Sequence, residues 1–156
     1  MQRDMQDFIE QAGMLWEDDG LPRIAGRIFA LALVSNEALS LDEIASRLGV
    51  SKASVSNDTR LLERLGFIER VSRPGDRKDY YQSSERSFER AIAERVRRMG
   101  QLQALIESGK ALAIDSPSVR DRLDDHHTAF SHVTKALQSA LQEIQARHNH
   151  SADAPA

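Results

Sequence analysis

The hydrophobic positions along this chain recur mostly with the period of an α-helix. Between residues 5 and 16 the apolar side chains fall on one helical face, and the acidic stretch EDDG at residues 17–20 ends that pattern. Pro22 suits the first turn of a second helix, which we expect to continue to about Val34. The apolar residues of this second helix lie on almost all sides of it, so we expect the helix in the centre of the core.

Two shorter helices are marked by signals at their ends. Ser40 and Glu43 have the spacing of a capping box, in which each side chain bonds the backbone of the other. Apolar residues follow at intervals of three and four until Gly49, which ends the helix. Ser51 is the expected N-cap of the next helix, which ends at Gly66.

The period changes in the middle of the chain. FIERVS at residues 67–72 has strand character, RPGDRK at residues 73–78 is a turn, and DYYQS at residues 79–83 is a returning strand. The Pro-Gly pair places the bend of this hairpin. We expect at least one of Tyr80 and Tyr81 to pack the hairpin onto the core.

The two short helices have the spacing of a helix-turn-helix. Ala45 is small where the two helices must cross, Gly49 permits the sharp turn, and Val55 can anchor the second helix on the first. Asp58 departs from this pattern, because an apolar residue is usual at its position. Together with the hairpin that follows, the spacing predicts a winged helix-turn-helix.

The second helix of the motif divides into two faces. At 100° per residue, the inward positions are Val55, Thr59, Leu62 and Leu65, whereas the outward side chains are small or polar and then cationic. Small residues let a helix enter a major groove, and an N-terminal turn suits a phosphate. A polar outer face is also ordinary for a surface helix. Because the turn at Gly49 and the following hairpin both indicate a winged helix-turn-helix, we favour DNA binding. The predicted contacts come from Ser51, Lys52, Ala53, Ser54, Ser56, Asn57, Arg60 and Arg64.

Positive charge is concentrated in the hairpin. Residues 1–20 carry six acids against one arginine, whereas residues 70–78 carry four cations against Asp76 alone. A guanidinium at an exposed tip can enter the minor groove, although a solvated charged turn is the plainer alternative. We predict that Asp76 pairs with a nearby arginine and shapes the turn. The predicted DNA-binding residues of the wing are Arg73, Asp76, Arg77 and Lys78, with Arg77 the first choice for insertion.

After a break at Asp115-Ser116-Pro117, the last helix, expected from about residue 118 to residue 148, carries a heptad seam. Its apolar side chains alternate by four and three, and a small winged-helix core cannot cover a seam of this length. An intramolecular hairpin with the helix at residues 88–112 is one alternative. We favour a homodimer, which predicts a palindromic operator, with contacts from Phe8, Val119, Leu123, His126, Phe130, Val133, Leu137 and Ile144.

We therefore predict a mainly α fold with a small β-hairpin wing, in which a winged helix-turn-helix is flanked by long dimerisation helices. The expected divisions are an N-terminal helix that contributes to dimerisation, the DNA-binding domain, two C-terminal dimerisation helices and a disordered tail, at residues 1–20, 21–85, 86–148 and 149–156.

Composition limits the remaining possibilities. The 156 residues are 40% hydrophobic and 29% charged, with a net charge of −3 and no cysteine. The lack of cysteine excludes disulfides, thiol sensing and cysteine-bound zinc, and it suits a reducing cytoplasm. The N-terminus does not read as a signal peptide, and the longest apolar run, residues 28–34, is too short to cross a membrane. We expect a cytoplasmic protein without a membrane partner.

Other candidate sites carry weaker signals. Trp16, Phe29 and Phe88 could line an effector pocket and hold a cation by their ring faces, although core packing is their plainer role. No two histidines lie four apart on a helix, so we predict no metal site and no cofactor. The sequence has no phosphate loop or nucleophile motif, and we predict that the protein is not an enzyme.

The segment GVSKASVSNDTRLLERLGFIERV, followed by RPGDRKDYY, resembles the MarR-type winged-helix transcriptional regulators. LPRIAGRIFALALVS and the GDRKDYY wing are more similar to the GbsR-like branch. The resemblance implies that residues 51–60 read the major groove, that residues 76–78 meet the minor groove, and that terminal helices form a dimer. Some GbsR-type members are linked to choline or glycine betaine metabolism, but no residue here carries that ligand over.

We therefore expect a homodimeric, sequence-specific regulator of transcription, acting as a repressor and modulated by a small-molecule effector. Two alternatives stay open at this point. The basic wing of an interaction module could dock an acidic protein partner, or the chain could bind a small molecule without affinity for double-stranded DNA.

Overall fold

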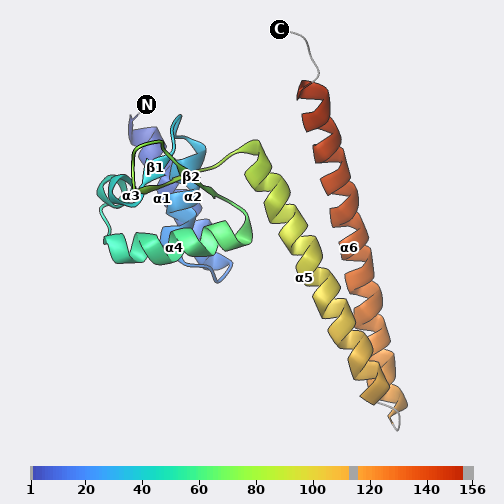
Figure 1. The fold of residues 1–156 in the computed structure, drawn as a ribbon. Helices are drawn as coiled ribbons and strands as arrows, with labels where there is room; N and C mark the ends of the chain where they lie inside the picture. Colours follow the sequence, from blue (N-terminus) through green and yellow to red (C-terminus); the bar gives the residue numbers. More distant parts are fainter. Residues whose placement is uncertain (1, 113–115, 153–156) are drawn as a thin grey trace. The chain divides into compact units, whose positions relative to one another are not determined.

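The structure, a computed structural model, describes residues 2–112 and 116–152. It is mainly helical with one small sheet, as predicted (Figure 1). Its elements, in chain order, are α1 (Gln2–Asp18), α2 (Arg23–Leu33), β1 (Leu39–Ser40), α3 (Leu41–Leu48), α4 (Lys52–Leu65), β2 (Glu69–Ser72), β3 (Asp79–Gln82), α5 (Glu85–Leu112) and α6 (Pro117–Ala152).

The chain forms two compact units, Met1–Arg90 and Ala91–Ala156, and α5 continues from the first into the second. The first unit contains the winged helix-turn-helix. This division falls close to the predicted end of the DNA-binding domain at residue 85, but it places α1 in the same unit as the motif.

The signals at the helix ends are confirmed. Ser40 accepts a hydrogen bond from the backbone N–H of Glu43, whose carboxylate accepts in return from the backbone N–H of Ser40 at 2.7 Å. Gly49 and Gly66 end α3 and α4 with φ angles of +64° and +85°. That left-handed region costs little only for glycine, so these two residues set where the helices stop.

The sheet has three strands in the order β1-β3-β2, and both pairings are antiparallel. β2 and β3 form the predicted hairpin, with Val71 opposite Tyr80. β1 was not predicted, because its two residues carry no strand pattern of their own. It pairs Leu39 with Tyr81 and Ser40 with Tyr80, and this pairing attaches the wing directly to the start of α3.

The core of the first unit forms around α2, as its apolar surface predicted. Ala25, Ile28 and Ala30 on α2 are almost completely buried. At Gly26 there is no space for a side chain, because an added Cβ would lie 2.6 Å from the carbonyl oxygen of Ala12 on α1. This close approach lets α1 and α2 pack tightly beside the helix-turn-helix.

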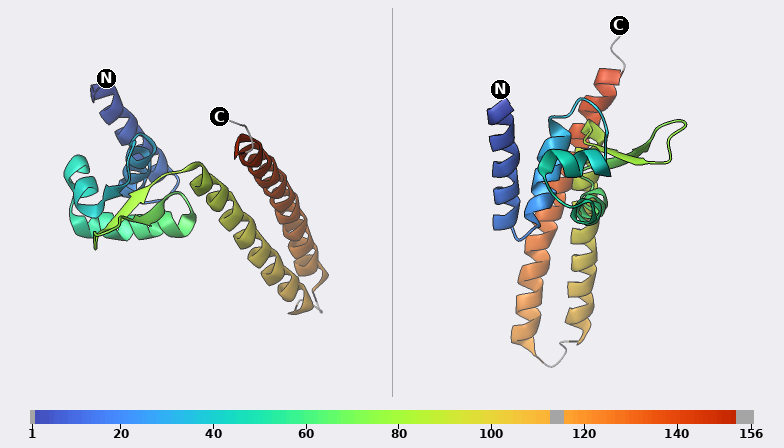
Figure 2. Two further views of the ribbon diagram at one scale, coloured as in Figure 1. Left: turned by 45° about the horizontal axis from the view of Figure 1, so that its top comes forward. Right: turned by 90° about the vertical axis from the view of Figure 1, so that its left-hand side faces the viewer.

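In the second unit, the end of α5 packs against the beginning of α6. The Lys110 ammonium lies 2.5 Å from an Asp124 carboxylate oxygen, and a Cβ added at Gly109 would lie 3.6 Å from the Leu123 side chain. Figure 2 shows the two helices joined at this end. Part of the seam on α6 is therefore covered within the chain. α6 extends to Ala152, so residues 149–152 are helical where a disordered tail was predicted; residues 153–156 of that tail lie outside the described residues.

Candidate nucleic-acid interface

The first turn of α4 is capped by Ser51. Its hydroxyl oxygen accepts a hydrogen bond from the backbone N–H of Ser54 at 3.2 Å. The amides of Lys52 and Ala53 are among those that a helix leaves without an internal acceptor, so they favour an anion. The Lys52 ammonium, however, lies 2.8 Å from an Asp42 carboxylate on α3, with both side chains more than half exposed. Lys52 is therefore shared between that carboxylate and any approaching phosphate.

The structure confirms three of the four inward positions predicted on α4, whereas the fourth, Leu65, is half-buried. Val55, Thr59 and Leu62 are completely buried, and the Thr59 hydroxyl donates to the carbonyl oxygen of Val55 at 2.8 Å. On the opposite face Ser54 and Ser56 are half-buried, and the exposed side chains are Ala53, Asn57, Arg60 and Arg64. The helix thus presents two small or amide side chains near its beginning and two guanidinium groups further along.

Asp58, which departs from the helix-turn-helix pattern, lies between these two faces. It is half-buried, and burial raises the pKa of its carboxyl group. A carboxylate there costs desolvation energy without adding to the inward apolar face. The helix tolerates it because Val55, Thr59 and Leu62 already fill the contact with the rest of the unit.

Asp76 shapes the tip of the wing, but its partner differs from the prediction. Its carboxylate accepts hydrogen bonds from the Tyr80 hydroxyl at 2.6 Å and from the backbone N–H of Lys78 at 2.9 Å. These bonds, that of Tyr80 above all, lower the pKa of Asp76. The expected pairing with an arginine was wrong, because the tyrosine on β3 returns to within reach of the turn.

Arg73 lies at the base of the wing and contacts other parts of the unit. Its guanidinium is 4.0 Å from the centre of the Tyr80 ring and donates to the carbonyl oxygen of Ala38 at 2.9 Å. It also lies 3.6 Å from a Glu37 carboxylate oxygen. Its contacts therefore tie the wing to the segment before α3. Arg73 was predicted to contact DNA, but these contacts favour a positioning role.

Arg77 and Lys78 are exposed at the tip of the hairpin, which projects from the helices of its unit (Figure 2). Within the described ranges, no hydrogen bond or ion pair involves the Arg77 guanidinium. Gly75, with a φ angle of +80°, makes the bend that holds both side chains out. Tyr80 and Tyr81 are buried at 7% and 6% exposure, so the base of the projecting hairpin is packed as predicted.

The sequence that forms this fold is similar to those of known proteins. A sequence profile of the MarR family matches residues 19–79, from the end of α1 to the start of β3. The HTH-type transcriptional regulator MmpR5 of Mycobacterium tuberculosis is 33% identical over 146 residues, which are 92% of this chain and 88% of that protein. The chain belongs to the MarR family. MarR-family proteins are DNA-binding regulators of transcription, and not a family of enzymes.

One solved structure closely matches the fold of this chain. The crystal structure of a transcriptional regulator has 32% sequence identity and a TM-score of 0.85, and the match covers 92% of this chain and 99% of the other. A mutant of MepR from S. aureus, bound to an oligodeoxyribonucleotide, has 19% identity and a TM-score of 0.42, with 89% and 91% of the two chains covered. The first of these shares the fold of this chain.

Arg27 is a positioning residue of the MarR-type motif that sequence reasoning missed. Its guanidinium donates to the carbonyl oxygen of Leu48, the last residue of α3, at 2.9 Å, and lies 2.7 Å from a Glu10 carboxylate oxygen on α1. It therefore connects α1 and α2 to the turn before α4. An arginine in the middle of a largely apolar helix was the available signal, but it does not identify the partners.

The aromatic residues predicted to line a pocket lie near one another in the first unit. A cavity of about 370 Å³ is lined by Phe29, Leu33, Phe67, Ser83, Ser84 and Phe88. Trp16 does not line it, but packs behind it, with ring centres 5.5 Å from Phe29 and 5.1 Å from Phe67. The walls are mainly apolar, so the cavity suits an apolar ligand better than a charged one.

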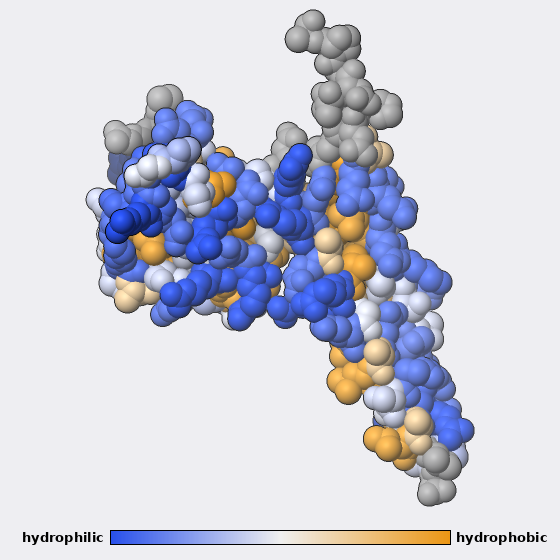
Figure 3. All heavy atoms as spheres, viewed as in Figure 1, coloured by the Kyte–Doolittle hydropathy of each residue, from blue (hydrophilic) through white to orange (hydrophobic). Residues whose placement is uncertain are grey.

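The seam predicted on α6 is only partly shielded in the single chain. Val119, Leu123, Phe130, Leu137 and Ile144 are half-buried, whereas His126 and Val133 are exposed. Apolar side chains also reach the surface on α1 and α5, among them Phe8, Leu105 and Leu112. Figure 3 shows hydrophobic residues at the surface of the two long helices. Such exposed apolar surface is unusual for a chain that acts alone.

Across 2–112 and 116–152 there is no group of three or more histidine, aspartate or glutamate side chains placed to hold a metal ion. Over the same ranges no helix combines the length and apolar character that crossing a membrane requires.

Proposed function

We propose that this MarR-family regulator binds a palindromic operator as a homodimer and represses transcription in the cytoplasm. In this proposal α4 enters the major groove, where Asn57 and Arg60 contact base edges, and Arg77 enters the adjacent minor groove. The observation that carries the proposal is the exposed Arg77 on a wing tip that is itself fixed by Asp76 and Tyr80. A fixed tip with an unpaired cation suits a groove of negative potential.

The proposed homodimer is supported by apolar side chains that the single chain leaves exposed. Val133 on α6 is 49% exposed, Phe8 on α1 is 44% exposed, and Leu112 on α5 is 87% exposed. Covering these side chains would remove apolar surface from water, which favours association. A twofold dimer also brings two copies of α4 to successive turns of one DNA face, which is why a palindromic operator is expected.

An effector site is proposed at the cavity beside Phe29 and Phe88. Its volume, about 370 Å³, is within the range of small-molecule sites, and its walls are mainly apolar. We also keep the placement in the GbsR-like branch as a proposal, on the segment at residues 21–35 and the GDRKDYY wing. The apolar walls do not by themselves point to a quaternary ammonium ligand.

The proposal is tested by fluorescence anisotropy with a duplex from the region upstream of the protein's own gene and a scrambled duplex of equal length. We expect tighter binding to the first duplex. With about six phosphate contacts, affinity should fall about 10³-fold between 50 and 200 mM salt. Equal affinity for both duplexes would contradict sequence-specific recognition. Absence of binding to either duplex would favour a module that docks an acidic protein partner.

A further inference from the structure

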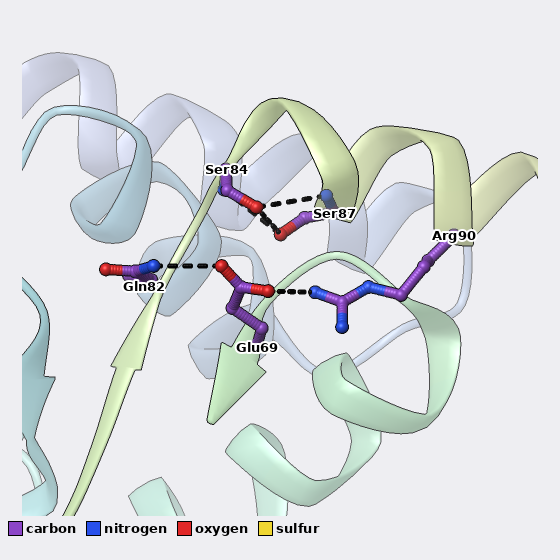
Figure 4. Close-up of polar contacts among 5 residues, drawn as sticks. All are labelled: Glu69, Gln82, Ser84, Ser87 and Arg90. Carbon is purple, nitrogen blue, oxygen red and sulfur yellow. Dashed lines mark hydrogen bonds and ion pairs between the residues drawn. The ribbon is translucent and has the colours of Figure 1, made fainter. Parts of the chain in front are cut away.

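The base of the wing and the start of α5 are joined by a network of five polar residues (Figure 4). Ser84 precedes α5, and its hydroxyl oxygen accepts from the backbone N–H of Ser87 at 3.2 Å. In return, the backbone N–H of Ser84 donates to the Ser87 hydroxyl oxygen at 3.0 Å. This reciprocal arrangement is a capping box with serine at the third position, and Ser87 is only 1% exposed. It fixes the point at which α5 begins.

Glu69 on β2 connects this helix start to both strands of the wing. One of its carboxylate oxygens accepts from the Gln82 side-chain amide on β3 at 2.8 Å, and the other accepts from the Arg90 guanidinium on α5 at 2.6 Å. Hydrogen bonding from Gln82, and then from Ser84 and Arg90, holds the pKa of Glu69 below its usual value, so it is ionised near neutral pH. We call Glu69 and Arg90 the wing–helix clamp.

The clamp holds an end of α5 that apolar packing holds weakly. Phe88, one turn into the helix, is 56% exposed. All five residues of the network belong to the first unit, whereas the same helix continues without interruption to Leu112 in the second. Because an exposed ion pair adds little stability, the clamp is better suited to setting a direction than to holding the fold together.

We propose that Glu69 and Arg90 are positioning residues, which set the direction in which α5 leaves the winged-helix unit and thereby the operator half-site spacing that the homodimer accepts. This inference rests on the proposed function for its DNA consequence. On B-DNA, one extra base pair moves a half-site by about 3.4 Å and rotates it about the axis. A homodimer in which the direction of α5 is fixed should therefore bind weakly to an operator with a changed spacing. A homodimer in which that direction varies should bind both spacings.

The direction of α5 can be measured without DNA. The chain has no cysteine, so Asn57→Cys on α4 and Gln101→Cys on α5 provide two unique exposed sites for spin labels. Labelled chains, diluted with an excess of unlabelled chains, report the distance within one chain by double electron–electron resonance. We expect a single narrow distance distribution in the parent, and its loss in Arg90→Gln and in Glu69→Gln.

A matched control is Arg97→Gln, because Arg97 forms its ion pair with Glu94 on the same helix. Arg97→Gln should leave the distance distribution narrow. Arg90→Lys, which keeps the positive charge, should retain most of the narrow distribution that Arg90→Gln loses. Thermal unfolding of each variant should stay close to that of the parent. Distributions as narrow in both clamp variants as in the parent would overturn the positioning role.

The DNA consequence is tested with duplexes that carry identical half-sites separated by the natural spacing or by one base pair more. In Arg90→Gln the preference for the natural spacing should fall by about 5-fold, which is within the range known for residues that touch neither partner. An unchanged preference in that variant would overturn the effect on spacing. If the parent binds none of the duplexes, the operator function is wrong, and the spin-label distances still decide the clamp.

Discussion

Arg73 and Arg77 lie four positions apart in the wing and have different surroundings. Arg73 stacks on Tyr80 and bonds the carbonyl oxygen of Ala38, whereas Arg77 is exposed at the tip. The same side chain can therefore anchor the wing at its base and remain available at its tip. The difference arises from two contacts of Tyr80. Its hydroxyl donates a hydrogen bond to the Asp76 carboxylate, and its ring packs against the Arg73 guanidinium.

Arg77→Ala should weaken operator binding by about 1–3 kcal/mol, because it removes the cation proposed to enter the minor groove. The affinity is measured by fluorescence anisotropy at one fixed salt concentration, with the oligomeric state checked by sedimentation velocity. Arg95→Ala removes the same charge from an exposed position on α5 and should have little effect. Equal losses in the two variants would show that only overall charge matters.

Among the elements, the pair α3 and α4 depends on one backbone position between them. Gly49 has a φ angle of +64°, and an added Cβ would meet no atom within 4 Å. The requirement for glycine there is therefore conformational and not steric. Gly100, inside α5, also has open space around it, but it lacks a positive φ angle. Substitutions at the two glycines therefore distinguish the cost of a left-handed backbone from the cost of a steric clash.

Gly49→Ala should lower the free energy of unfolding by about 1 kcal/mol, because alanine in the left-handed region is strained. Gly100→Ala should raise that free energy by about 0.5–1 kcal/mol, because alanine is the better helix former. Urea denaturation followed by circular dichroism measures both changes. A loss of stability of equal size in Gly100→Ala would indicate that space around the glycines, and not backbone conformation, governs the result.

At the scale of the whole molecule, the seam on α6 has two kinds of position. Leu123 faces Gly109 on α5, where an added Cβ would lie 3.6 Å from it, whereas Val133 is 49% exposed. The intramolecular hairpin and the homodimer were alternatives for the whole seam. In the structure, α5 covers the seam at the beginning of α6, as the intramolecular helical hairpin predicts. The exposed seam positions further along α6 are available to a second chain.

Val133→Glu should weaken the homodimer by about 2 kcal/mol, because a charge would have to be buried at the interface. Gln138→Glu adds the same charge at an exposed position away from the seam and should leave association unchanged. Sedimentation velocity over a range of protein concentrations measures both. Identical dissociation constants for the two variants and the parent would place the dimer interface elsewhere.

Short stretches of the sequence by themselves determined the helix ends and the buried face of the motif's second helix. The capping box at Ser40, the left-handed glycines at positions 49 and 66, and the inward face of α4 all depend on residues a few positions apart. Such signals are local, because caps, turns and helical periodicity are set by the backbone geometry of one segment. The winged helix-turn-helix and its exposed cations could therefore be predicted without a structure.

Only the tertiary structure decided which partners the polar side chains take. Arg73 bonds a carbonyl 35 residues away, Arg27 reaches the end of α3, and Glu69 meets Arg90 across 21 positions. β1 was missed for the same reason, since its two residues become a strand only beside β3. A sequence pattern reports the face on which a residue lies, whereas its partner depends on which distant segments the packing of the core brings together.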